Sequence, residues 1–197
     1  KKFSPLHLAV DNGSFRIVKL LSEKKANLNI KDSIGHTPLI YAILNSNIEI
    51  IEFLLQNGAD PNIKNNEGES TLHLAIKHYN DGNIKKIEIL LKNKNIDINI
   101  QDDMGETPLH EAIRIQNKEI INLLLKNNAD PNIKDYNTGS SAIDFATMFK
   151  MSLIISSSIS DLFTFTDEDL IIKSIKESIK ENKEKNLIDI KNVESQE

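Results

Sequence analysis

The sequence predicts an all-α fold, a solenoid of stacked helix-turn-helix units with projecting turns, and three observations lead to this prediction. One order of residues recurs, so that Leu39 follows Leu6 by 33 residues and Leu72 follows Leu39 by 33. Each period contains two short runs in which apolar residues follow helical spacing. Single glycines and helix-capping residues separate the runs, which is typical of short helices joined by turns.

The first unit comprises residues 1–30 and reads SPLHLAVDNGSFRIVKLLSEKKANLNI from Ser4 onward. Ser4 is a helix-capping residue, and Pro5 fits the first helical position because its missing N–H costs nothing there. Gly13 is expected to end this helix. The apolar residues that follow predict a second helix, packed antiparallel on the first: Ile17, Val18, Leu20 and Leu21.

The second unit, residues 31–63, is the fullest copy and reads DSIGHTPLIYAILNSNIEIIEFLLQNGADPN from Asp32 onward. The third unit, residues 64–100, departs from it in two ways. Ser70-Thr71 replaces Thr-Pro, which keeps a capping hydroxyl but loses the proline. Three extra residues also lengthen the turn between its helices, from His78 to Asn83. We expect this insertion to form a longer loop without disturbing the stack.

The fourth unit, residues 101–133, is regular, with Thr107 as cap and Pro108 at the first helical position. The fifth unit, residues 134–163, has Asp144 in place of histidine and no Leu-Leu pair. Terminal repeats are often atypical because one face meets water, so we expect a degenerate cap there. Residues 164–197 predict a C-terminal amphipathic helix and a frayed tail. Its apolar stripe, which comprises Leu170, Ile171, Ile175 and Ile179, is expected to cap the last repeat.

These motifs resemble the ankyrin repeat family. The resemblance rests on the period of 33, the pattern Asp-x-x-Gly-x-Thr-Pro-Leu-His, the Leu-Leu pair and the sequence Gly-Ala-Asp-x-Asn, and it covers roughly residues 3 to 145. It implies an ankyrin-repeat solenoid with projecting β-turn or hairpin links and a capping helix at the C-terminal end. It also implies a non-enzymatic scaffold for protein–protein interaction. His7, His73 and His110 would then be framework residues that hydrogen-bond the neighbouring backbone.

Composition and motifs exclude several other classes of function. The net charge of −5 does not suit a nucleic-acid surface, which needs clustered positive charge. No run approaches the roughly 18 apolar residues of a membrane span, so we expect no membrane insertion. Without cysteine, a zinc site at His73 and His110 would lack its remaining ligands. We therefore expect no metal, no cofactor and no enzymatic activity, in a soluble monomer that is cytoplasmic or, alternatively, a secreted effector.

Positions that the repeat framework leaves free are expected to face solvent together, on the concave face and at the turn tips. Large apolar groups among them favour a protein partner, because a solvated face does not need such groups. Acidic residues cluster in the third and fourth units, which indicates a partner that presents basic residues. The predicted partner-binding residues are Ile34, His36, Tyr41, Leu44, Asn45, Glu67, Glu69, Lys77, His78, Tyr79, Asp103, Met104, Glu106, Glu111, Arg114, Ile115 and Tyr136.

Two alternative functions stay open at the level of sequence. The repeats could be the targeting or regulatory segment of a larger enzyme or secreted effector, since Lys1 leads directly into a repeat. The stripe from Leu170 to Ile179 could instead bind a partner or a second copy of the chain, and self-association through it would give a dimer that is lost when residues 167–197 are removed.

Overall fold

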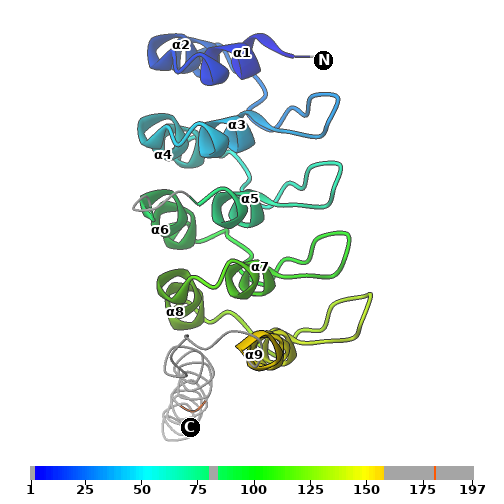
Figure 1. The fold of residues 1–197 in the computed structure, drawn as a ribbon. Coiled ribbons are helices and arrows are strands. Elements are labelled where there is room, and N and C mark those ends of the chain that lie inside the picture. The colour runs from blue at the N-terminus through cyan, green and yellow to red at the C-terminus, as the bar shows by residue number, and fades with distance from the viewer. Residues whose placement is uncertain (1–2, 80–83, 158–179, 181–197) are drawn as a thin grey trace, which may run out of the picture.

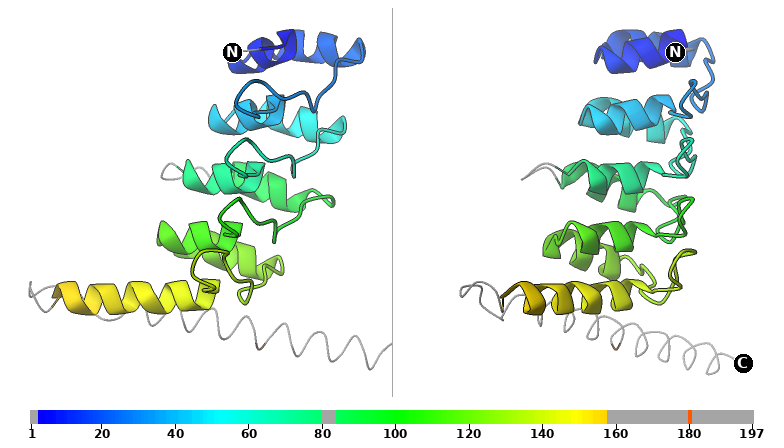
Figure 2. Two further views of the ribbon diagram at one scale, coloured as in Figure 1. Left: turned by 90° about the vertical axis from the view of Figure 1, so that its right-hand side faces the viewer. Right: turned by 45° about the vertical axis from the view of Figure 1, so that its right-hand side comes forward.

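Paired helices stack into an elongated solenoid in the computed structural model, which describes residues 3–79, 84–157 and 180 of the 197. One layer holds the inner helices and the other holds the outer helices (Figures 1 and 2). The inner helices are α1 (Pro5–Asp11), α3 (Pro38–Leu44), α5 (Thr71–Lys77), α7 (Pro108–Arg114) and α9 (Ala142–Ser157). The outer helices are α2 (Phe15–Glu23), α4 (Ile48–Gln56), α6 (Lys85–Lys92) and α8 (Lys118–Lys126). The predicted all-α solenoid is confirmed.

The inner helices begin as the capping residues predict. The side chains of Ser4, Ser70 and Thr107 each cap their helix together with a histidine three residues on, which bonds back to the capping residue's N–H. Such reciprocal pairs satisfy two backbone N–H groups that the first helical turn leaves unpaired. In α9 the same arrangement is kept with Asp144, whose Oδ2 accepts from the Ser141 N–H at 2.8 Å. An aspartate can therefore replace the histidine at this position, because either side chain accepts a hydrogen bond from the N–H of the capping residue.

The outer helices follow short links in the second and fourth units. Ser46 and Gln116 adopt positive φ angles of 52° and 54° in these links. The next residue, Asn47 or Asn117, then caps the outer helix by accepting from the N–H three residues on. The third unit differs here, because its longer link includes residues outside the described part and α6 begins after Ile84 without a side-chain cap. The three-residue insertion therefore falls between two helices, as predicted.

Hairpin turns project from the inner-helix layer, one between each unit and the next (Figure 1). The carboxylate Oδ1 of Asp32 accepts from the N–H groups of Ile34 and His36, both at 2.9 Å, and Asp102 repeats this pattern two units later. Adjacent turns contact each other, since the Tyr136 N–H donates to the Met104 carbonyl at 2.8 Å. The turns thus form a continuous edge along the stack.

A hydrophobic core runs between the two layers through all the units. Leu39, Leu72 and Leu109, which recur at the same position of the motif, are almost fully buried. The first unit is less well covered, because Ile17 is 50% exposed whereas Ile50, its counterpart one unit later, is fully buried. Leu20 is also exposed, although its helical spacing predicted packing. Both lie at the end of the stack, where the described residues include no preceding unit.

The last inner helix is longer than those before it. Ser156 and Ser157 form its C-terminal end. Helix α9 is 16 residues long, whereas α7 has seven. The predicted C-terminal helix and its stripe from Leu170 to Ile179 lie outside the described residues.

Candidate protein-binding surface

The motif histidines connect successive units and are fully used by the framework. Nδ1 of His73 accepts from the Ser70 N–H at 3.3 Å, and its Nε2 contacts the Glu106 carbonyl in the next unit at 3.0 Å. A carbonyl only accepts, so Nε2 carries the proton and the ring is neutral. His7 and His110 make the same two kinds of contact. Their predicted role as framework residues is confirmed.

Burial favours the neutral form of two of these rings. It lowers the pKa of His73 and of His110, and hydrogen bonds to the Glu106 and Ser140 carbonyls oppose this only in part. Because both ring nitrogens are bonded, neither histidine has a lone pair available for a metal ion. Throughout the part of the chain that the structure describes, no group of three or more His, Asp and Glu residues could hold one.

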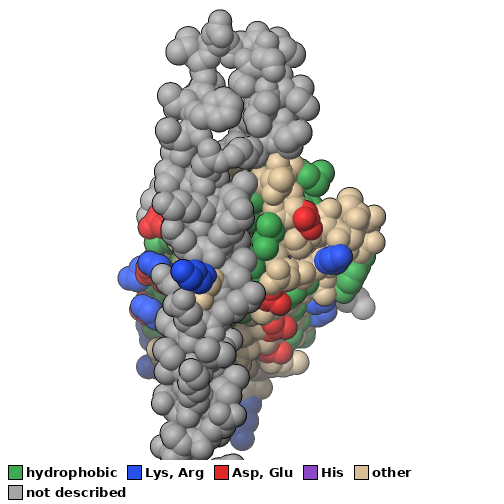
Figure 3. Space-filling view, turned by 90° about the horizontal axis from the view of Figure 1, so that it is seen from below, with side chains coloured by type: hydrophobic (Ala, Val, Ile, Leu, Met, Phe, Trp, Pro, Cys, Tyr) green, Lys and Arg blue, Asp and Glu red, His purple; other side chains and the backbone are tan. Residues whose placement is uncertain are grey.

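The turn tips carry large apolar side chains in the open. Tyr136 is 67% exposed and Met104 is 56% exposed, and the hydrogen bond between their turns makes them neighbours. The Tyr136 hydroxyl also donates to Oε1 of Gln101 at 3.3 Å. Ile34 occupies the same position as Met104 two turns earlier and is likewise exposed. Seen from the C-terminal end, hydrophobic and acidic side chains are both visible beside the residues drawn in grey (Figure 3).

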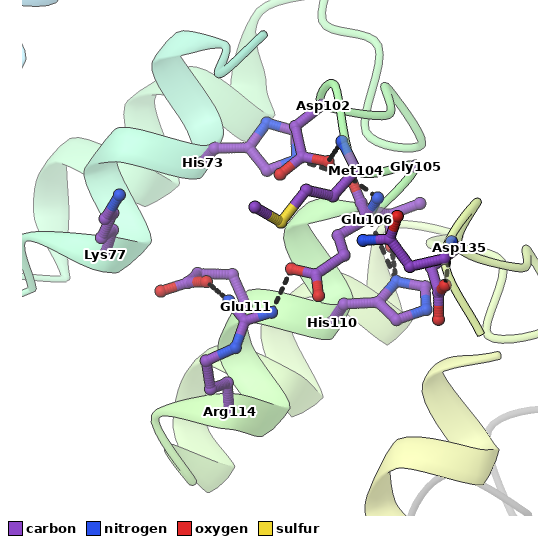
Figure 4. Close-up of polar contacts among 12 residues, drawn as sticks. His73, Lys77, Asp102, Met104, Gly105, Glu106, His110, Glu111, Arg114 and Asp135 are labelled. Carbon is purple, nitrogen blue, oxygen red and sulfur yellow. Dashed lines mark hydrogen bonds and ion pairs between the residues drawn. The ribbon is translucent and has the colours of Figure 1, made fainter. Parts of the chain in front are cut away.

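Ion pairs occupy the inner-helix side of the third and fourth units. Lys77 donates to Oε1 of Glu69 at 2.7 Å. Arg114 bridges the carboxylates of Glu106 and Glu111 (Figure 4). Burial raises the pKa of Glu111, and the positive charges of Arg114 and Lys77 offset only part of this rise. Several charges predicted to meet a partner are therefore already paired within the chain.

Glu69 was predicted to face solvent, and this prediction is wrong. Glu69 is buried. Asn65 replaces the usual aspartate of this turn, and its side-chain amide donates to Oε2 of Glu69 at 2.9 Å. Burial alone would raise the pKa of Glu69, but the hydrogen bonds from Lys77 and Asn65 outweigh it and lower the pKa. An aspartate at position 65 could not donate in this way.

Tyr41 was also predicted to be a solvent-facing anchor, and the structure places it in the core. It is 9% exposed, and its ring lies 5.5 Å from that of Phe3 and 5.4 Å from that of His36, measured between centroids. Its hydroxyl donates to Oδ2 of Asp32 at 2.8 Å. Tyr41 packs against Phe3 and His7 of the preceding unit, and Leu74 at the same position of the next repeat is also buried.

The other predicted residues divide by exposure. Tyr79 and Ile115 are half-buried and pack against the core cluster, so only part of each side chain can meet a partner. The half-buried predicted residues are His36, Leu44, Tyr79, Glu106, Glu111 and Ile115. The exposed predicted residues are Ile34, Asn45, Glu67, Lys77, His78, Asp103, Met104, Arg114 and Tyr136.

Two features of the structure were missed at the level of sequence. Lys86 is buried at a position where Ile50 and Ile120 stand in other units, a difference that the period itself could have revealed. A groove of about 400 Å³ also lies between α4 and α6, on the outer helices and away from the turn tips. It is lined by Glu52, Leu55, Gln56, Lys85, Glu88, Ile89, Lys92 and Asn93.

None of the described helices is long and apolar enough to cross a membrane.

Comparison with known proteins identifies a family but no individual relative. No curated protein gives a significant match. A family model described as ankyrin repeats (3 copies) matches residues 1–65 and residues 57–135, which include the first four helix pairs. The chain therefore belongs to the ankyrin repeat family.

Proposed function

We propose that this chain is a non-enzymatic module that binds a partner protein through its turn tips and the concave side of its inner helices. Ankyrin repeats are generally protein–protein interaction modules. The observation that carries the proposal is the adjacent pair Met104 and Tyr136, two large apolar side chains that lie more than half exposed on neighbouring turns. Aromatic residues and methionine are enriched at protein interfaces, where they often dominate the binding free energy.

The charge around this pair favours a partner that presents basic residues. Asp103 and Glu67 are exposed on the adjacent turns. On the inner-helix side of the third and fourth units, the ion pairs join three acids, Glu69, Glu106 and Glu111, to two cations, Lys77 and Arg114. Such an excess of acids would speed association with a positively charged segment and would exclude acidic ones. The binding surface in this proposal comprises Met104 and Tyr136 as anchors, with Glu67 and Asp103 at the rim.

Affinity capture from the source cells followed by mass spectrometry tests this proposal. Wild-type chain, a Met104→Ala/Tyr136→Ala double variant and a Leu8→Ala/Leu20→Ala double variant would serve as baits. Leu8 and Leu20 are a matched control, because they are apolar and about half exposed but lie in the first unit. A captured partner is then purified, and its affinity for each bait is measured by calorimetry.

We expect the anchor variant to lose the partner and the control variant to keep it. The binding free energy should weaken by at least about 2 kcal/mol if these residues are a hot spot. Thermal unfolding of all three baits checks that the fold is intact. Equal affinity of the anchor variant and the wild type would rule out this surface, and a partner bound only by the wild type and the anchor variant would move the site to the first unit.

A further inference from the structure

Lys86 is a fully enclosed amine in the second residue of α6. It is 1% exposed, and Ile50 and Ile120 occupy the corresponding position of the neighbouring units. Its Nζ donates to the His78 carbonyl at 2.9 Å, to Oγ of Ser46 at 3.4 Å and to the Ile43 carbonyl at 3.5 Å. All three acceptors are uncharged oxygens. A buried ammonium group is costly unless it is hydrogen-bonded, so this position calls for a specific explanation.

The acceptors of Lys86 lie at the C-terminal ends of two adjacent inner helices. Ile43 and Ser46 belong to the end of α3 and the link that follows it, and His78 is the C-cap of α5. Helix C-termini leave carbonyl groups without partners inside the helix and carry a partial negative charge. A cation placed between two such ends can satisfy both, so the contacts suit the charge of the amine.

The unusual lysine and the unusual link occur in the same unit. In the second and fourth units the N–H groups of Asn47 and Asn117 fold back onto the carbonyls of Ala42 and Ala112, at 3.0 and 3.2 Å. Those links have one residue with positive φ and leave room for isoleucine at the position of Lys86. The third unit has three more residues between its helices, and its longer link follows His78, the C-cap of α5.

We infer that Lys86 is a positioning residue that compensates for the longer link of the third unit. It holds the ends of α3 and α5 together at the C-cap of α5, which the longer link follows. It thereby fixes His78 and Tyr79, whose N–H groups donate to the carbonyls of Leu74 and Ile76 at 3.0 and 2.9 Å. The consequence for binding rests on the proposed function, because both residues lie on the inner-helix side.

A double-substitution cycle in the full chain tests the coupling. One change is Lys86→Ile, which introduces the residue of the neighbouring units, and the other is deletion of residues 80–82, which gives the third unit a link of ordinary length. Amide hydrogen exchange at Asn45, Ser46, His78 and Tyr79 reports on the two helix ends. With the natural link, Lys86→Ile should speed exchange there about tenfold, because hydrogen bonds from a charged donor are lost.

The midpoint of global unfolding should stay the same or rise in that variant, since a buried charge is replaced by an apolar group. In the shortened chain, Lys86→Ile should leave exchange at the four amides unchanged. Lys86→Met, which keeps the length of the side chain but lacks the amine, should reproduce the local effect. Ile120→Met in the fourth unit controls for side-chain shape and should not alter exchange at the corresponding helix end.

Equal effects of Lys86→Ile in both link lengths would overturn the inference, as would unchanged exchange with the natural link. If the shortened chain does not fold, amide exchange in Lys86→Met with the natural link is decisive instead. Faster exchange at the four amides supports the inference, and unchanged exchange overturns it. These measurements need no partner, so they remain decisive if Met104 and Tyr136 bind nothing. With an identified partner in hand, lower affinity of Lys86→Ile would extend the positioning role to recognition.

Discussion

Tyr41 and Asp32 form a buried hydrogen bond that joins an inner helix to its hairpin turn. The Tyr41 hydroxyl donates to Oδ2 of Asp32 at 2.8 Å, while Oδ1 of the same carboxylate accepts from the N–H groups of Ile34 and His36. Burial raises the pKa of Tyr41, and the Asp32 carboxylate raises it further. One side chain therefore closes the turn and also satisfies a phenol in the core.

Tyr41→Phe should reduce stability and leave partner binding intact. The substitution removes a hydrogen bond to a charged acceptor, which contributes about 1.5–3 kcal/mol to the free energy of unfolding. Urea unfolding at pH 7 measures the change, and calorimetry with a captured partner measures binding. A variant with wild-type stability and weakened binding would return Tyr41 to the partner-binding surface.

Most of the framework could be predicted from the sequence because its causes are local. Ser4, Pro5 and Thr107 mark helix starts through their own backbone chemistry, and the recurring leucines mark the core. The burial of Tyr41 and Glu69 could not be predicted in this way. It depends on how Tyr41 stacks on the preceding unit and on one amide, that of Asn65, which the motif alone does not specify. Contacts between units and contacts within a turn together decide which nonrepeating side chains remain exposed.

Ile17 and Ile50 should differ strongly in their sensitivity to substitution, although they occupy the same position of the repeat. Ile50 is fully buried and Ile17 is 50% exposed. Ile50→Ala should cost about 2–5 kcal/mol because it leaves a cavity between two units. Ile17→Ala should cost less than about 1 kcal/mol, since water already reaches that side chain. Chemical unfolding of both variants checks the order, and equal costs would show that the end of the first unit is covered in solution.

Gly105→Ala should loosen the turn edge beside Tyr136. Gly105 has a φ angle of 79°, and a Cβ built there would lie 2.5 Å from the backbone nitrogen of Tyr136. Gly58→Ala is the matched control, because its φ angle is 90° but no atom lies within 4 Å of the added Cβ. The left-handed conformation costs a non-glycine residue about 1–3 kcal/mol. Thermal unfolding should show a larger loss for Gly105→Ala, and equal losses would mean that the turns can separate without cost.

Stability should fall as the pH drops below neutrality, because of His73 and His110. Burial lowers the pKa of both rings in the folded chain. Their contribution is complete above the unfolded pKa of about 6.5, and it is lost as the pH falls from there through the folded pKa, since the unfolded chain then binds more protons. The slope is at most about 1.4 kcal/mol per pH unit for each histidine.

Urea unfolding between pH 7.5 and pH 5.5 measures this slope. The control is the His73→Gln/His110→Gln variant, because glutamine suits the capping box and does not titrate. The double variant should show a flatter dependence than the wild type. An unchanged slope would assign the acid sensitivity to other groups.

Arg114→Ala should destabilise the chain more at pH 7 than at acid pH, because Arg114 bridges the carboxylates of Glu106 and Glu111. Burial already raises the pKa of Glu111, and Arg114 is the largest influence that lowers it. Without the cation, the pKa of Glu111 rises further, and the two carboxylates repel each other when both are charged.

A folded-state pKa above the unfolded value means that folding gains stability as the pH falls and the carboxyl binds a proton. The loss at pH 7 should be about 1 kcal/mol or less, since the arginine is partly exposed to solvent, and it should shrink as the pH approaches 4.5. Urea unfolding measures the free energy of unfolding of wild type and variant at each pH. In the difference between the two, the titration of all other groups cancels. In Arg114→Ala/Glu111→Gln the pH dependence of this loss should disappear, and a loss that is equal at both pH values in Arg114→Ala alone would show that the arginine acts through packing of its stem rather than through its charge.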